Sequence, residues 1–289
     1  AEAMWLGVFH AVSAFNNAGF STFSDNVMGF ATDPLILMPL MVAITIGGFG
    51  FPVLHELILR RGHKARLSMH ASLTLWGSVA LVTIGTVGIF AFERGRPETL
   101  GALSSLDAWL VALFTSVSAR TAGFNAMDMG HMSIASMALH YFLMFIGGGS
   151  AGTAGGVKVT TFCLLLLVVW SEIRGSSDVE YRGRRVAETA QRQALTILVL
   201  SSAVIVLAMM ALLPMTELPY HVVLFEVVSA FATVGLSTGI TADLPPAAQG
   251  VIIALMYAGR VGVVTLALAL AINQVPRAYR YPEEKPIVG

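Results

Sequence analysis

The sequence predicts an all-α membrane protein made of repeated units, each with two spanning helices and a re-entrant loop between them. The first observation is composition: 56% of the 289 residues are hydrophobic and only 12% are charged, whereas soluble domains carry about 25% charged residues. The second is a short phrase that occurs three times along the chain. The third is the concentration of basic residues in alternate loops between long apolar runs.

The repeated phrase begins with Phe, has Ser-Ala four and five residues later, and ends in a small residue, Gly and an apolar residue. It occupies residues 9–20, 114–124 and 225–236, and the second copy is one residue shorter between Ser-Ala and Gly. The interval between copies is too long for a solenoid repeat. It suits two spanning helices plus a re-entrant loop, so each copy is expected to be a pore helix followed by that loop.

Three stretches carry a specific family resemblance. Residues 13–20 read Ser-Ala-Phe-Asn-Asn-Ala-Gly-Phe, residues 120–124 read Arg-Thr-Ala-Gly-Phe, and residues 229–238 contain Thr-Val-Gly. They resemble the second, third and fourth pore loops of the Trk/Ktr/HKT superfamily of potassium transporters, the third in its Ktr-like form. That family joins four repeats around one pore. The resemblance implies a Ktr-type ion-translocating membrane subunit, N-terminally truncated, with three pore loops present and the first repeat of four missing.

The elements follow in order from the lengths of the apolar runs, because a spanning helix needs about 20 apolar residues. Three shorter runs are expected to be pore helices: 4–15, 110–119 and 219–231. Four longer runs are expected to cross the membrane, with a polar, basic loop at 172–192: 34–59, 68–92, 194–213 and 247–272. The expected divisions are a partial second repeat, a third repeat with a glycine-rich intramembrane loop, and a fourth repeat with a cytosolic tail: 1–66, 67–192 and 193–289.

The apolar run from 131 to 170 must be interrupted. As one straight helix it would measure about 60 Å, twice the thickness of the hydrocarbon core. The break is expected in the glycine-rich stretch 147–156. The start of this stretch also matches the dinucleotide-binding pattern G-x-G-x-x-G. Such a site needs a preceding strand, and none is expected here. The resemblance implies a gate beneath the pore loops, and a packing kink is the alternative. The candidate gate residues are Gly147, Gly148, Gly149, Ser150, Gly152, Gly155, Gly156 and Arg260.

The tight loop after each pore helix is the candidate selectivity filter. Backbone carbonyl oxygens of such loops can replace the water shell of a potassium ion, and glycine lets the backbone approach the ion closely. The alternative is that these loops are simple turns between helices. The candidate ion-binding residues are Asn17, Ala18, Gly19, Thr121, Ala122, Gly123, Thr233, Val234 and Gly235.

Three basic residues are expected at membrane depth. Arg260 lies in the middle of the last predicted span, where a charge is costly and usually faces a cavity. The resemblance places it next to the glycine-rich loop, and an ion pair with Glu226 is the alternative. Lys158 is expected to snorkel or to stabilise that loop. Arg120 is expected to pair with an acidic residue of a pore helix.

The other basic residues orient the chain. Most of them fall in alternate loops and in the C-terminal tail, whereas Arg94 and Arg96 fall in a loop on the opposite side. The positive-inside rule places the richer side in the cytoplasm. We therefore expect a multi-pass protein of the plasma membrane whose filters lie near the extracellular side.

The expected function is potassium uptake through a carbonyl-lined filter, with sodium dependence left open. No enzyme motif is present, zero net charge gives no reason to expect a nucleic-acid partner, and the single Cys163 forms no intrachain disulfide. A non-conducting membrane scaffold, or a transporter of another monovalent cation such as sodium, is the alternative. The expected ligands are potassium and, in a coupled mechanism, sodium, without a covalently bound cofactor. Besides the lipid bilayer, the resemblance implies a homodimer with a cytosolic ring of nucleotide-binding regulatory subunits.

Overall fold

The computed structural model describes residues 2–59, 67–262 and 265, and confirms the predicted all-α architecture. Its principal elements in chain order are α1 (Glu2–Phe15), α2 (Pro34–Phe49), α3 (Phe51–Leu59), α4 (Met69–Glu93), α5 (Ser105–Ala119), α6 (Ile134–Phe145), α7 (Val159–Ile173), the short strands β1 (Glu180–Tyr181) and β2 (Arg184–Arg185), α8 (Glu188–Leu212), α9 (Tyr220–Phe231) and α10 (Pro246–Val261). Single helical turns lie between them: η1 (Met28–Phe30), η2 (Pro97–Gly101), η3 (Met129–His131), η4 (Leu213–Met215) and η5 (Thr241–Asp243).

Side-chain caps explain where several helices begin. Asp33, Ser68, Ser104 and Ser133 each accept a hydrogen bond from a backbone N–H in the first turn of α2, α4, α5 and α6. Such a cap satisfies a donor that the helix itself leaves unpaired. The cap at Ser104 starts the second pore helix earlier than the predicted residue 110, because the polar residues before the apolar run already belong to its first turn.

Two helices are long and apolar enough to cross a membrane in the described part of the chain: Met69–Glu93 and the continuous stretch Glu188–Met215. The predicted span over residues 34–59 is bent, because α2 and α3 meet at an angle of 98°. The break is at Gly50, which has a φ of 86°. A side chain there would collide with the carbonyl oxygen of Ser150, only 2.4 Å from an ideal Cβ.

The long run from 131 to 170 is broken as predicted. Helix α6 ends at Phe145, α7 begins at Val159, and a parallel bridge between Ile146 and Val157 closes the base of the loop between them. The stretch predicted as a polar, basic loop, 172–192, holds the β1–β2 hairpin and the start of α8. Part of the predicted last span and of the tail, and the basic segment 60–66, lie outside the described residues.

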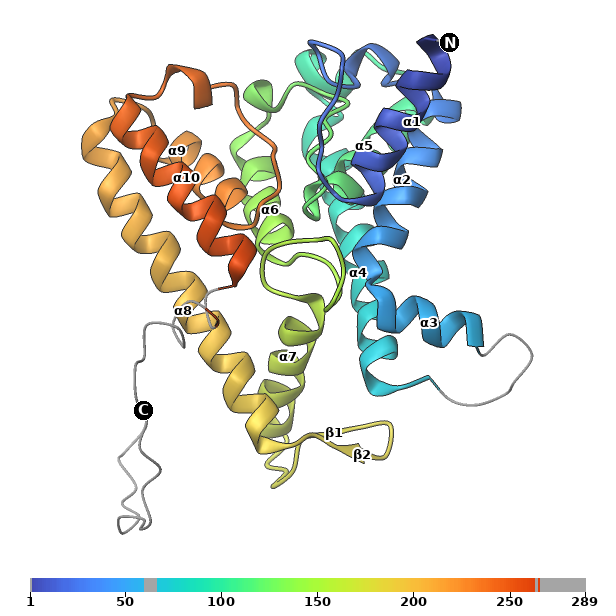
Figure 1. Cartoon of the computed structure of the whole chain (residues 1–289), viewed down its shortest axis with the longest axis vertical. Helices are drawn as coiled ribbons and strands as arrows, with labels where there is room; N and C mark the ends of the chain where they lie inside the picture. The colour runs from blue at the N-terminus through green and yellow to red at the C-terminus, as the bar shows by residue number, and fades with distance from the viewer. Residues whose placement is uncertain (1, 60–66, 263–264, 266–289) are drawn as a thin grey trace.

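The three short pore helices each pack against a longer neighbour: α1 against α2, α5 against α4, and α9 against α10. In Figure 1 the first two pairs lie on one side of the molecule and α8 to α10 on the other, with α6, α7 and the loop between them in the middle. The buried core is apolar and includes Phe114, Phe124 and Phe225. Many apolar side chains also point outward, among them Leu35 at 84% and Leu207 at 64% exposure, as expected for a lipid-facing surface.

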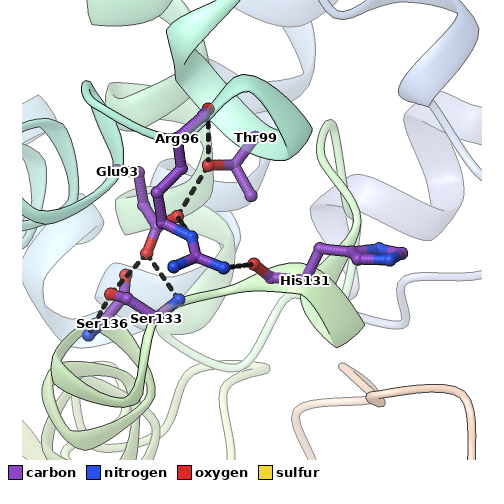
Figure 2. A network of polar contacts seen from close by, with 6 residues as sticks. All are labelled: Glu93, Arg96, Thr99, His131, Ser133 and Ser136. Atoms are coloured by element: carbon purple, nitrogen blue, oxygen red, sulfur yellow. Dashed lines mark hydrogen bonds and ion pairs between the residues drawn. The ribbon is translucent and has the colours of Figure 1, made fainter.

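A buried carboxylate ties together three elements at one end of α4. Glu93 is 0% exposed and accepts hydrogen bonds from Thr99 Oγ1 at 2.6 Å and from the N–H and Oγ of Ser133 at 2.9 and 2.7 Å (Figure 2). Arg96 lies 3.7 Å from the same carboxylate and donates a hydrogen bond to the carbonyl of His131. The cluster fixes the end of α4 to η2 and to the start of α6.

The two ends of α4 separate the basic loops. In the sequence its N-terminal end follows the basic segment 60–66, and Ser72 near this end lies within hydrogen-bond distance of Tyr181 in β1, at 2.9 Å. The arginine-rich β1–β2 hairpin therefore lies near the N-terminal end of α4. Arg94 and Arg96 follow the opposite end of this helix.

Candidate ion-conducting site

The residues proposed as a filter form three short segments, 17–19, 121–123 and 233–235, called here the candidate filter segments. All three have the same backbone conformation. Each begins with a non-glycine residue in the left-handed region: Asn17 (φ 50°), Thr121 (φ 72°) and Thr233 (φ 51°). Each ends with a glycine of positive φ: Gly19 (71°), Gly123 (84°) and Gly235 (92°). Positive φ outside glycine is uncommon and costs free energy, so its threefold recurrence marks a shared requirement.

A serine of the pore helix holds the exit of each candidate filter segment. Its hydroxyl donates a hydrogen bond to the carbonyl of the residue that follows the glycine: Ser13 to Phe20 (2.8 Å), Ser118 to Phe124, and Ser229 to Leu236 (2.5 Å). The shared bond supports the alignment of the three copies, including the residue missing from the second. It also turns these three carbonyls back toward the pore helices.

The candidate filter segments meet one another although they lie far apart in the sequence. An ideal Cβ on Gly19 would lie 2.5 Å from the carbonyl oxygen of Ala122, and one on Gly123 would lie 2.3 Å from that of Val234. A Cβ on Gly235 would lie 3.6 Å from the Cα of Gly123. The backbones are therefore side by side, and the two closest approaches admit only glycine.

The carbonyl groups at the centre of this cluster are free. Those of Ala18, Ala122 and Val234 accept no hydrogen bond from any residue that the structure describes. Ala122 and Val234 are only 0% and 1% exposed. Buried carbonyls are almost always paired, so a group of unpaired ones is suited to a dehydrated cation. The carbonyl of Gly19 differs, because it accepts a hydrogen bond from Asn26 Nδ2 at 3.3 Å.

The glycine-rich loop, residues 147–156, lies against all three candidate filter segments (Figure 1 shows it in the middle of the molecule). Thr153 Oγ1 donates a hydrogen bond to Asn17 Oδ1 at 3.0 Å, and the N–H of Gly155 donates one to Thr121 Oγ1 at 3.1 Å. An ideal Cβ on Gly155 would lie 2.1 Å from Thr233 Oγ1. The loop thus contacts the first residue of every segment.

The loop is closely packed and hydrogen-bonded. The N–H of Gly149 donates to the carbonyl of Gly48 at 2.7 Å, and that of Thr153 donates to the carbonyl of Gly47 at 3.2 Å. Gly47 itself lies so close to the end of α1 that an ideal Cβ would be 1.8 Å from the carbonyl oxygen of Phe15. Gly47 therefore lets the end of α1 and the glycine-rich loop pack closely against α2.

All three basic residues expected at membrane depth donate to carbonyls of the glycine-rich loop. Arg260 Nη1 donates to Thr153 at 2.8 Å, Arg120 Nη2 to Gly147 at 2.9 Å, and Lys158 Nζ to Ala154 at 2.5 Å. The expected pairing of Arg120 with a pore-helix acid is wrong, because its guanidinium turns toward the loop carbonyl. The role expected of Lys158 agrees with its contact.

The alternative pairing of Arg260 with Glu226 is also wrong. The carboxylate of Glu226 accepts hydrogen bonds from residues that follow the third candidate filter segment, Ser237 and Thr241 among them. Sequence reasoning treated Glu226 only as a counter-ion and missed Thr153 altogether. One sequence feature could have indicated that Glu226 belongs to the site. It directly follows the Phe of the repeated phrase, as His10 and Thr115 do in the other two copies.

Comparison with known proteins agrees with this geometry. Residues 1–278 match the family TrkH, described as cation transport protein. The chain is 38% identical over 288 residues to Ktr system potassium uptake protein B of Vibrio alginolyticus, covering 99% of this chain and 63% of that protein. It is 36% identical to the protein of the same name from Bacillus subtilis and to potassium/sodium uptake protein NtpJ of Enterococcus hirae, covering 100% of this chain and 64% and 65% of those proteins.

A solved structure shares the fold. The crystal structure of the potassium transporter TrkH from Vibrio parahaemolyticus superimposes with a TM-score of 0.77 at 20% identity, covering 92% of this chain and 58% of that one. The chain thus spans somewhat less than two thirds of the length of the relatives it matches. The match to the family extends over nearly all of its residues, and the chain belongs to the TrkH family of cation transport proteins.

Proposed function

We propose that this chain lines a potassium uptake path across the cytoplasmic membrane, with the three candidate filter segments as part of its selectivity filter. The observation that carries the proposal is the meeting of three backbones of equal conformation around carbonyls without hydrogen-bond donors. The pore helices end next to these segments, and the negative ends of their dipoles favour a cation there. The names of the relatives, two potassium uptake proteins and one potassium/sodium uptake protein, point to the same class of ion.

The packing of α4 against α5 supports a proposal for which side of the membrane the filter faces. Phe90 near the end of α4 stacks on Trp109 near the start of α5, with ring centroids 4.0 Å apart. Ser116, near the end of α5, donates a hydrogen bond to the carbonyl of Val82 in the middle of α4. The pore helix therefore descends from the end of α4 that carries few basic residues. This supports filters in the outer half of the membrane.

The glycine-rich loop is proposed as the gate on the cytoplasmic side of the filter. Its contacts with the candidate filter segments and the donated bond from Arg260 support a plug that must move before an ion passes. The positive charge of Arg260 adds an electrostatic barrier to a cation. A homodimer and a cytosolic nucleotide-binding ring are proposed from the family resemblance, with the β1–β2 hairpin on the side where such a ring would bind.

Rubidium uptake by liposomes that contain the full-length protein tests the proposal. Uptake is expected to saturate with rubidium, to be competed by potassium, and to be competed only weakly by sodium. A sodium-coupled mechanism would show uptake that depends on sodium on the outside. Equal rates in protein-containing and empty liposomes would support the non-conducting scaffold instead. Uptake of sodium with no preference for rubidium would support a sodium transporter.

A further inference from the structure

One position of the pore helix faces the outer end of its own filter loop. It follows the Phe of the repeated phrase and is occupied by His10, Thr115 and Glu226. In the first copy His10 Nε2 lies 3.0 Å from Ser21 Oγ, and in the third copy Ser237 Oγ donates to Glu226 Oε1 at 2.5 Å. In each case the serine is the second residue after the filter glycine. The position therefore acts as a brace between pore helix and filter exit.

The three copies differ in how firmly this position holds the loop. The hydroxyl of Thr115 is buried and has no hydrogen-bond partner among the described residues, so the second copy has no brace at this position. His10 is within hydrogen-bond distance of Ser21 Oγ, and its ring stacks on Phe23 of the same loop. Glu226 accepts bonds from Ser237, from the N–H of Thr238 at 3.0 Å and, through Oε2, from Thr241 Oγ1 at 2.9 Å. The third segment is the one held by a carboxylate.

The environment of Glu226 makes these bonds strong. The residue is only 5% exposed, and it forms no ion pair with any residue that the structure describes. A buried carboxylate must be satisfied by its donors, and bonds to a charged acceptor are about twice as strong as neutral ones. The loop beyond Gly235 is thus fixed from two directions, by Glu226 and by the bond from Ser229 to Leu236.

We propose that Glu226 is a positioning residue that holds segment 233–235 at the spacing required for potassium and so sets the preference over sodium. A filter that contracts around the smaller sodium ion loses selectivity, and one mechanism against contraction is to anchor the backbone behind the carbonyls. Glu226 contacts no carbonyl of the segment, so its effect passes through the loop 236–241. The inference rests on the proposed function.

The test measures rubidium uptake and its competition by sodium in liposomes with the full-length protein. Glu226→Gln keeps the shape of the side chain but removes the charge and turns an amide N–H₂ toward hydroxyl donors. It is expected to lower the rubidium-to-sodium preference about tenfold, equivalent to about 1.4 kcal/mol. Glu226→Asp retains the charge with a shorter reach and should restore part of the preference.

Glu93→Gln is the matched control (Figure 2). Glu93 is also a buried carboxylate with three hydrogen-bond donors, but it joins α4, η2 and α6 and contacts none of the candidate filter segments. This variant should lower the melting temperature and leave the ion preference unchanged. An equal loss of preference in both variants would show that general loosening is responsible and would overturn the inference.

Two further variants keep the test informative if Glu226→Gln does not fold. Ser237→Ala and Thr241→Val each remove one donor to the carboxylate and should each lower the preference in part. Added to Glu226→Gln they should lower it no further, because the brace is already lost. Normal preference in folded Ser237→Ala, Thr241→Val and Glu226→Gln proteins would refute the role of Glu226. A wild-type protein without rubidium uptake would instead refute the proposed function.

Discussion

Replacing Arg260 by Ala is expected to raise the maximal potassium flux while the filter preference stays nearly unchanged. Arg260 donates one hydrogen bond to the carbonyl of Thr153 in the glycine-rich loop, at 2.8 Å. A bond from a charged donor contributes about 1.5–3 kcal/mol. Because Arg260 is exposed in the described chain, we take the low end of this range. Loss of about 1.4 kcal/mol from the closed state would raise the ratio of open to closed loop about tenfold.

The assay is the initial rate of rubidium uptake at saturating rubidium in liposomes with equal amounts of inserted protein. Arg260→Lys separates the charge from the bond, since it keeps a cation near the loop but loses the guanidinium geometry. It should raise the flux less than Arg260→Ala does. Arg94→Ala is the control: Arg94 lies at the C-terminal end of α4 and does not contact the glycine-rich loop, so its removal should leave the flux unchanged. Lower flux in well-inserted Arg260→Ala protein would mean that the loop is a structural kink, and collapse of the ion preference would mean that loop and filter are one element.

Four further predictions concern single residues. Gly235→Ser should insert normally, because the nearest backbone atom is 3.6 Å from an ideal Cβ, but it should lower the rubidium-to-sodium preference in competition assays, because a side chain at φ 92° strains the segment. Gly123→Ala should abolish uptake, because its Cβ would lie 2.3 Å from a carbonyl oxygen. Thr153→Val removes the bond to Asn17 at constant shape and should raise flux severalfold, at a cost of about 1 kcal/mol to the closed loop; unchanged flux would argue against a role for this bond in closing. Glu93→Gln should destabilise the fold by about 1–3 kcal/mol, seen as a lower melting temperature, and an unchanged melting temperature would refute its structural role.

Much of the architecture could be predicted from the sequence because it depends on local patterns. The three copies of the repeated phrase located the pore helices, and the length of the run 131–170 required the break that the structure has between Phe145 and Val159. The length of an apolar run did not show where the chain bends within it. Residues 34–59 are long enough for one span, but the bend at Gly50 depends on the loop that packs against it.

The partners of the charged residues could be predicted only in part. The family resemblance placed Arg260 next to the glycine-rich loop, and it donates to a backbone carbonyl there. Arg120 was expected to pair with a carboxylate, yet it too donates to a carbonyl of this loop. These carbonyls can accept side-chain hydrogen bonds because the loop is not helical and does not pair them with its own N–H groups. A residue pattern does not show which carbonyls a loop leaves unpaired, so the pairing emerges only when the segments are brought together. The hydrogen bonds of Glu226 could be identified only from the structure, which shows where the loop after Gly235 lies.

The contacts of the glycine-rich loop limit how independent a gate and a filter can be. The loop bonds to side chains of Asn17 and Thr121, the residues in left-handed conformation that begin two candidate filter segments. The carbonyls proposed for the ion belong to the same segments, but those of Ala122 and Val234 lie against glycines of the neighbouring segments and accept none of these bonds. A loop that withdraws therefore releases the side chains first. The carbonyl spacing is preserved only if other anchors hold it, and the bonds from Ser13, Ser118 and Ser229 to the filter exits are such anchors. This division of anchors is the physical reason to expect that opening changes the flux more than the selectivity.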